Sequence, residues 1–142
     1  MGHPADAQRY LSKSKDYKNI FDHQKGWFRP KNADGSWQKW PENGRMTQDY
    51  GTVESNPYQQ GWFVPQDVAG MVALMGGPEK VQADLTSMFD HTPDNFMWND
   101  YYNHANEPVH HVPFLFNRVG APWLTQKWTR KICANAYQNK VE

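Results

Sequence analysis

Apolar residues recur at helical spacing in several stretches of the chain, and polar, Gly- and Pro-rich segments separate these stretches. In residues 5–21, Tyr10, Leu11 and Tyr17 fall on one side behind Pro4, so the pattern predicts an amphipathic helix. A second helix is predicted from Val68 through Met75, because its apolar positions keep this spacing until two glycines end it.

Three further helices follow from the same periodicity. Pro78 opens a helix whose apolar residues lie on one face, namely Val81, Leu85, Met88 and Phe89. Residues 108–119 and 122–137 predict two more helices, joined by a turn at Gly120. Pro113 should make the first turn of residues 108–119 irregular or shift its start.

The segments between these helices predict ordered loops. Residues 26–50 and 92–107 combine Pro, Gly, Asn and Asp with aromatic rings, and loops this long usually carry a function. No stretch alternates convincingly as a strand would. The pattern therefore predicts an all-α fold of stacked helical hairpins.

Composition narrows the class of protein. The 142 residues suit one domain or part of one, and seven Trp, seven Tyr and seven Phe make its apolar content aromatic, which fits both a core and a groove that grips sugar. Fifteen basic and fifteen acidic residues are dispersed, so no nucleic-acid surface is indicated. No stretch approaches the roughly 20 apolar residues of a membrane span, and the single Cys133 excludes an internal disulfide.

Residues 50–67 form the first segment with candidate chemistry. Glu54 stands among Tyr, Trp and Phe residues, where partial desolvation would raise its pKa and keep it protonated, as a general acid requires. The alternative interpretation is that Glu54 and Asn56 only cap the turn that follows.

Residues 104–111 form the second segment. Asn106 and Glu107 supply oxygen ligands that suit a hard cation such as calcium. Imidazoles at His104, His110 and His111 could suggest zinc, but adjacent histidines on a helix diverge and the His-Glu-x-x-His motif is absent. The alternative for each His is a neutral side chain that is hydrogen-bonded in or near the core. A third segment, residues 117–126, shows only ordinary helix punctuation.

Several ordered motifs together resemble one known family. They are ESNPYQQGWFVPQD at residues 54–67, LMGG at 74–77, NEPVHHVPFLFN at 106–117 and GAPWLTQ at 120–126, preceded by FRP at 28–30 and DGS at 34–36. Their order and spacing resemble the catalytic domain of glycoside hydrolase family 92, over most of the chain from about Tyr10 onward.

This resemblance implies both a fold and a reaction. The fold is an (α/α)6 toroid packed on an N-terminal β-sandwich, of which residues 1–142 would be an internal part. The reaction is inverting, calcium-assisted hydrolysis of terminal α-mannosides in glycans, and a secreted or extracellular location is implied as well. The positions carried over are Glu54 as the acid, Asn106 and Glu107 as calcium or sugar ligands, and, as residues near the sugar, Asn56, Gln59, Trp62 and His104.

The chain also departs from the family pattern. The family usually has Gly-Asn-Ala-Trp-Gln-Tyr after the acid, where this chain has residues 55–60 (SNPYQQ). This chain also has Gln66 at a position where the family usually has a His. An inverting glycosidase needs a second carboxylate about 6.5–9.5 Å from the acid, and the family motif that carries this base does not occur here. We therefore expect a fragment that is inactive alone and needs the rest of the catalytic domain. The rival hypothesis is a non-catalytic carbohydrate-binding or interaction module.

Overall fold

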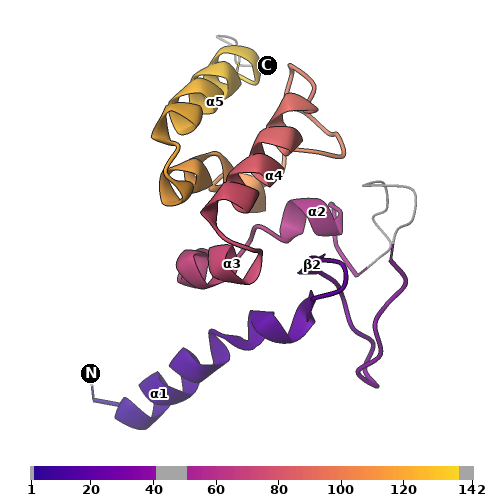
Figure 1. Cartoon of the computed structure of the whole chain (residues 1–142), viewed down its shortest axis with the longest axis vertical. Coiled ribbons are helices and arrows are strands. Elements are labelled where there is room, and N and C mark those ends of the chain that lie inside the picture. Colours follow the sequence, from indigo (N-terminus) through magenta and orange to yellow (C-terminus); the bar gives the residue numbers. More distant parts are fainter. Residues whose placement is uncertain (1, 41–50, 138–142) are drawn as a thin grey trace.

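The computed structural model describes residues 2–40 and 51–137, and it is mainly helical (Figure 1). The α-helices are α1 (Pro4–Lys13), α2 (Pro57–Gln60), α3 (Val68–Leu74), α4 (Pro78–Asp90) and α5 (Pro122–Asn135). The 3-10 helices are η1 (Asp16–Ile20), η2 (Pro65–Asp67), η3 (Glu107–Val109) and η4 (Val112–Val119), and the strands are β1 (Phe21–Asp22) and β2 (Trp27–Phe28). Residues 41–50 of the predicted loop lie outside the described residues.

The prediction of one amphipathic helix over residues 5–21 was wrong in its length and its burial. Helix α1 stops at Lys13, where the Ser14 hydroxyl donates to the Leu11 carbonyl, and the chain continues as η1 and β1. None of the α1 residues is buried, and Tyr10 and Leu11 are 61% and 70% exposed. Figure 1 shows α1 at one end of the molecule and α5 at the other.

A short antiparallel hairpin corrects the expectation that the chain has no strand. Phe21 pairs with Phe28, and Asp22 pairs with Trp27. The Asp22 carboxylate accepts hydrogen bonds from the backbone N–H groups of Gln24 and Lys25 and so stabilises the turn. Strands of two residues are too short to show alternation in the sequence.

Helix α4 confirms the prediction over residues 78–90. Gly77 precedes it at φ 100°, a conformation that favours glycine, and Pro78 occupies the first turn. Its buried residues are Val81, Leu85, Met88 and Phe89, as the periodicity predicts. The Phe89 ring lies 4.7 Å from Tyr102 and 5.0 Å from Trp128 between centroids, so one ring joins α4, α5 and the loop between them.

The predicted helix over residues 108–119 is two 3-10 segments, η3 and η4. Pro113 has no N–H to donate, which accounts for the irregular first turn. Gly120 ends η4 in the left-handed conformation at φ 78°, and α5 then packs along η4. The Thr125 hydroxyl fixes this packing by donating to the Pro113 carbonyl at 2.8 Å.

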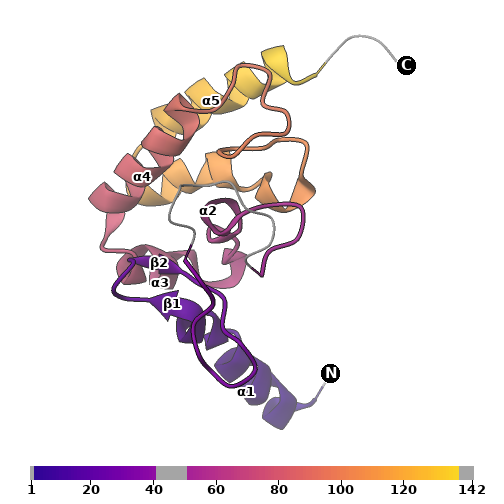
Figure 2. The ribbon, with the colours of Figure 1, turned by 90° about the vertical axis from the view of Figure 1, so that its right-hand side faces the viewer.

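The core lies where α3, α4, η4 and α5 meet, and the hairpin and α2 extend it (Figure 2). The Trp27 indole N–H of β2 donates to the Pro57 carbonyl of α2, which ties the hairpin to this helix. Within residues 2–40 and 51–137, no helix is long and apolar enough to cross a membrane.

Candidate active site

Asn56 begins helix α2 as its N-cap. Its Oδ1 accepts from the backbone N–H groups of Tyr58 and Gln59 at 3.0 and 3.1 Å, and Pro57 fills the first helical position. The alternative interpretation, that Glu54 and Asn56 cap the following turn, is therefore confirmed for the capping by Asn56 alone. Its Nδ2 also donates to the Asp100 carbonyl at 3.1 Å, so the side chain of Asn56 joins α2 to the loop before η3.

Gln59, one helical turn after Asn56, also joins α2 to the loop before η3. Its Nε2 donates to the carbonyls of Asn99 and Tyr101 at 2.7 and 2.6 Å, and its Oε1 accepts from the Ser55 hydroxyl at 3.0 Å. Gln59 and Asn56 are each 4% exposed. Both side chains hold the loop against α2, and their contact with a sugar stays a prediction.

Glu54 lies in the turn that enters α2. Its φ is 57°, which is unusual for a residue with a Cβ and costs energy that the surrounding structure must supply. Two side chains brace this turn: the Thr52 hydroxyl donates to the Ser55 carbonyl, and Gln60 Nε2 donates to the Val53 carbonyl. Strained backbone held by its surroundings is typical of functional sites.

The expectation that Glu54 is desolvated among aromatic rings was wrong for the described residues. Its side chain is exposed. The rings predicted to surround it face elsewhere: Tyr58 packs on Trp27 and Trp40, and Trp62 packs edge-on against Trp27.

Asn106 brings the second segment against the first. It is buried, and its Nδ2 donates to the Glu54 carbonyl at 3.2 Å across 52 positions of sequence. The neighbouring Glu107 begins η3, and its side chain is exposed. The candidate acid and the candidate ion ligands are therefore adjacent in space.

The donor chemistry at Asn106 and Glu107 fits a calcium ion in part. Because Asn106 Nδ2 is engaged by the Glu54 carbonyl and no hydrogen bond to its Oδ1 is found among the described residues, that oxygen is available as a ligand. With the Glu107 carboxylate it offers two of the six to eight oxygens that calcium takes. Across residues 2–40 and 51–137, no group of three or more His, Cys, Asp or Glu is placed to hold a metal ion.

The three histidines are hydrogen-bonded, as the alternative interpretation predicts, but His110 is exposed and not in the core. His110 Nε2 donates to the His104 carbonyl, and His111 Nε2 donates to the Trp62 carbonyl, since a carbonyl can only accept. His104 lies between the hydroxyls of Tyr102 and Tyr137, each at 2.7 Å, and its ring stacks on His110. Burial, and then the neighbouring His110, lower the pKa of His104.

Trp62 is a core residue in this structure. It is 2% exposed, and its ring centroid lies 5.0 Å from that of Trp27 at an angle of 79°. Its indole Nε1 has no hydrogen-bond partner among the described residues. The ring therefore packs between the hairpin and α2, and its contact with a sugar stays a prediction.

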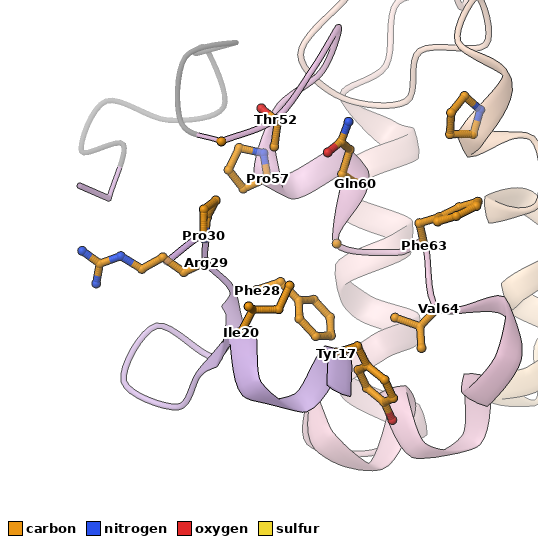
Figure 3. A pocket seen from close by; sticks show the side chains of 13 residues that line it. Tyr17, Ile20, Phe28, Arg29, Pro30, Thr52, Pro57, Gln60, Phe63 and Val64 are labelled. Atoms are coloured by element: carbon orange, nitrogen blue, oxygen red, sulfur yellow. The ribbon is translucent and has the colours of Figure 1, made fainter. Parts of the chain in front are cut away.

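A cavity of about 400 Å³ borders the two candidate segments (Figure 3). Thr52 and Gln60, which brace the turn of Glu54, line one side of the cavity. Pro108, the residue after Glu107, also lines it. Tyr17, Ile20 and Phe28 supply an apolar wall opposite Thr52 and Gln60.

Arg29 lines the same cavity and was missed as a site residue. Its Nη1 donates to Asp22 at 2.9 Å, and its Nε donates to the Gln38 carbonyl. Burial alone would raise the pKa of Asp22, but the hydrogen bonds from Arg29 and the turn amides lower it. Asp22 ends β1 and Arg29 follows β2, and two such polar residues on a short hairpin carry no periodic signal, so the sequence pattern could not reveal this ion pair.

Comparisons with known proteins agree on one family. The model of the glycosyl hydrolase family 92 catalytic domain matches residues 1–142. A family GH92 α-mannosidase of Bacteroides thetaiotaomicron is similar at 30% identity and a TM-score of 0.79, with 94% of this chain and 17% of that chain covered. The same enzyme in complex with mannoimidazole gives 26% identity and a TM-score of 0.81, covering 96% of this chain and 20% of that chain.

A further structure is also similar, and the curated proteins give no match. The GH92 family glycosyl hydrolase ccman5 is 34% identical with a TM-score of 0.59, and 73% of this chain and 13% of that chain are covered. None of the curated proteins matches significantly. The chain spans a fifth or less of the length of these solved structures. The match of the family model over all 142 residues shows that the chain belongs to glycosyl hydrolase family 92.

Proposed function

We propose that this chain is part of an enzyme that hydrolyses terminal α-mannosidic linkages with inversion, and that Glu54 is its general acid. The hydrogen bond from Asn106 Nδ2 to the Glu54 carbonyl supports this proposal most directly, because it joins the two segments that the family resemblance assigns to one site. The family match and the α-mannosidase neighbours support the substrate class.

The protein groups would act as follows. Glu54 donates its proton to the glycosidic oxygen while the bond from that oxygen to the anomeric carbon breaks. A water molecule attacks the anomeric carbon from the opposite face and loses its proton to a second carboxylate, which inverts the configuration. We propose that this base comes from the rest of the catalytic domain, so that residues 1–142 alone do not turn over mannosides.

Calcium is part of the same proposal. Asn106 Oδ1 and the Glu107 carboxylate would supply two of its oxygen ligands, and the bound ion would bring positive charge to the sugar hydroxyls. Because Asn106 also holds the Glu54 carbonyl, the position of the acid would depend on the order of this loop.

The test compares Glu54→Gln and Glu107→Gln in the complete gene product. Glu54→Gln keeps the shape but removes the proton, so an α-mannoside with a poor leaving group should lose several orders of magnitude in rate, and an activated aryl mannoside much less. Glu107→Gln should lose similar activity on both substrates, and added calcium should restore part of it.

The comparison must be made at one pH, because replacing the acid removes the basic limb of the rate profile. Equal losses on both leaving groups for Glu54→Gln would refute its assignment as the acid. If a chelator leaves the enzyme active and Glu107→Gln does not respond to calcium, the calcium assignment is wrong. Sugar binding without any turnover in the complete gene product would favour the carbohydrate-binding module instead.

A further inference from the structure

A second cavity, of about 190 Å³, lies between the hairpin, α2 and α4. Trp40, Tyr58 and Trp62 line it together with Lys80, Asp84 and Ser87 of α4. Among the described residues, its lining includes none of Glu54, Asn106 and Glu107, so it is separate from the proposed catalytic site. At about 30 Å³ for each water, its volume equals roughly six waters, which is room for one sugar ring.

Aromatic rings give this cavity walls of fixed orientation. Trp62 is almost fully buried, and Trp40 packs edge-on against Tyr58 with centroids 5.6 Å apart at 75°. Lys25 Nζ lies 5.7 Å from the centroid of the Trp40 ring and also lines the cavity. Trp40, which is only partly buried, offers ring surface against which the C–H groups of a pyranose can pack at little cost in side-chain entropy.

Polar groups come from one face of α4, because residues 80, 84 and 87 are three and four positions apart. Lys80 and Asp84 form an ion pair at 2.6 Å, and their side chains are 53% and 34% exposed. The Ser87 residue is exposed, and no hydrogen bond of its hydroxyl is found among the described residues. The rim therefore offers both donors and acceptors, and the carboxylate of Asp84 opposes the charge of Lys80.

We propose that this cavity binds one hexopyranose unit of a neutral glycan, as a second sugar site beside the catalytic one. Aromatic walls with a mixed donor and acceptor rim match a ligand that has apolar C–H faces and a ring of hydroxyls. Lys80 and Asp84 are paired with each other, and each keeps further donor or acceptor capacity at the rim that sugar hydroxyls can use and an apolar ligand cannot. The choice of a glycan rests on the proposed function, whereas binding at this cavity does not require hydrolysis.

The test uses the complete gene product with Glu54→Gln, so that ligand is not consumed, and titrates methyl α-D-mannopyranoside. Ser87→Trp should fill the cavity from an exposed helical position, and its control, Ala83→Trp, places the same ring on an exposed position of α4 outside the lining. Trp40→Ala should remove a wall. Its control is Trp37→Ala, a partly buried Trp that also has a lysine over its ring and does not line the cavity.

We expect Ser87→Trp and Trp40→Ala each to raise the Kd of the sugar at this cavity at least tenfold. The controls, Ala83→Trp and Trp37→Ala, should change this Kd less than twofold. Melting temperatures check that the variants fold. Selective ¹⁵N labelling of the tryptophans gives a second readout in protein with an unmodified cavity, where the indole N–H resonance of Trp40 should shift during the titration.

Unchanged binding in a folded Ser87→Trp variant, or no shift of the Trp40 resonance at saturating sugar, would overturn the proposal. If Ser87→Trp weakens binding but the complete gene product with Glu54 intact hydrolyses no α-mannoside, this site is upheld and the proposed function is rejected. If that protein hydrolyses α-mannosides but the cavity binds no sugar, the proposed function is upheld and this site is rejected.

Discussion

At the scale of single residues, the polar side chains around Glu54 mainly form hydrogen bonds to backbone groups. Asn56, Gln59 and Asn106 each bond to a carbonyl of another segment, and together they place the turn of Glu54 against the loop before η3. Placement by several side chains matters for a general acid, because a displacement of about 1 Å can cost on the order of 100-fold in rate.

Replacing Asn56 by Ala should loosen the start of α2. The variant loses the cap and the bond to the Asp100 carbonyl, at about 1 kcal/mol each, so the local opening free energy should fall by about 2 kcal/mol. Native-state hydrogen exchange should then show roughly 30-fold faster exchange at the amides of Tyr58 and Gln59. Asn32→Ala, at an exposed loop position, is the control, and unchanged exchange in Asn56→Ala would contradict the capping role.

Because of Asp67, the free energy of unfolding should depend on pH in the acidic range. Hydrogen bonds from Lys15 and then Tyr17 lower the pKa of Asp67 from 3.8 to about 2. Because the folded pKa is the lower one, this stabilisation is fully present above pH 4 and is lost as the pH falls from about 4 through 2. Denaturation midpoints measured across this range should fall less steeply for Asp67→Asn than for the unmodified protein.

Tyr17→Phe should behave between these two, because it removes one bond to Asp67 and keeps Lys15. The bond affects the other partner as well, since burial first and the bond to Asp67 second raise the pKa of Tyr17 to about 12. Parallel pH curves for Asp67→Asn and the unmodified protein would show that the ion pair with Lys15 is too well solvated to matter.

At the scale of elements, the sequence predicts best where one signal is long and local. Helix α4 has Gly76 and Gly77 before it, Pro78 in its first turn and four apolar positions on one face, and it forms as predicted. Residues 5–21 also have a leading Pro and apolar positions on one side, yet α1 ends at Lys13, and Tyr17 beyond it donates to Asp67, 50 positions away. A contact this distant leaves no mark in a window of neighbouring residues.

The candidate site shows the same limit. The alternative that Asn56 caps the following turn could be read from the sequence, because capping is local. The exposure of Glu54 could not be predicted, since it follows from a left-handed φ that Thr52, Gln60 and Asn106 brace together. The joining of Glu54 to Asn106 depends on tertiary structure and was expected only from the family resemblance.

The contact between η4 and α5 can be tested at Thr125. Thr125→Val keeps the shape and removes the bond to the Pro113 carbonyl, so the free energy of unfolding should fall by about 1–2 kcal/mol. Thr129→Val is the control, because its hydroxyl only bonds to carbonyls within α5 and its loss should cost less than about 0.5 kcal/mol. Denaturant titration measures both, and equal losses would contradict a special role for Thr125.

At the scale of the whole molecule, large apolar side chains face outward in more than one place. Tyr10 and Leu11 lie on α1, Phe63 follows α2, and Phe114 and Trp123 lie on η4 and α5, each more than half exposed. The region that matches this chain is a fifth or less of the solved relatives, and under the proposal above the rest of such a domain would cover these side chains. This agrees with the proposal that residues 1–142 need the remainder of the catalytic domain.

The isolated chain of residues 1–142 should therefore be helical but melt with weak cooperativity. Its aromatic core around Phe89 is buried, whereas α1 buries no residue and can unfold without disturbing that core. Far-UV circular dichroism should show a helical spectrum and a broad transition, and tryptophan fluorescence, to which the buried Trp27, Trp62 and Trp128 contribute, should change at a higher temperature than the helical signal of α1. Replacing Leu11 by Glu should leave both transitions in place, because the exposed side chain contributes no packing within the described residues. A single sharp transition of a monomer, coincident by both probes, would show instead that these residues form a complete cooperative unit, and the proposal that the rest of the domain covers them would then be wrong.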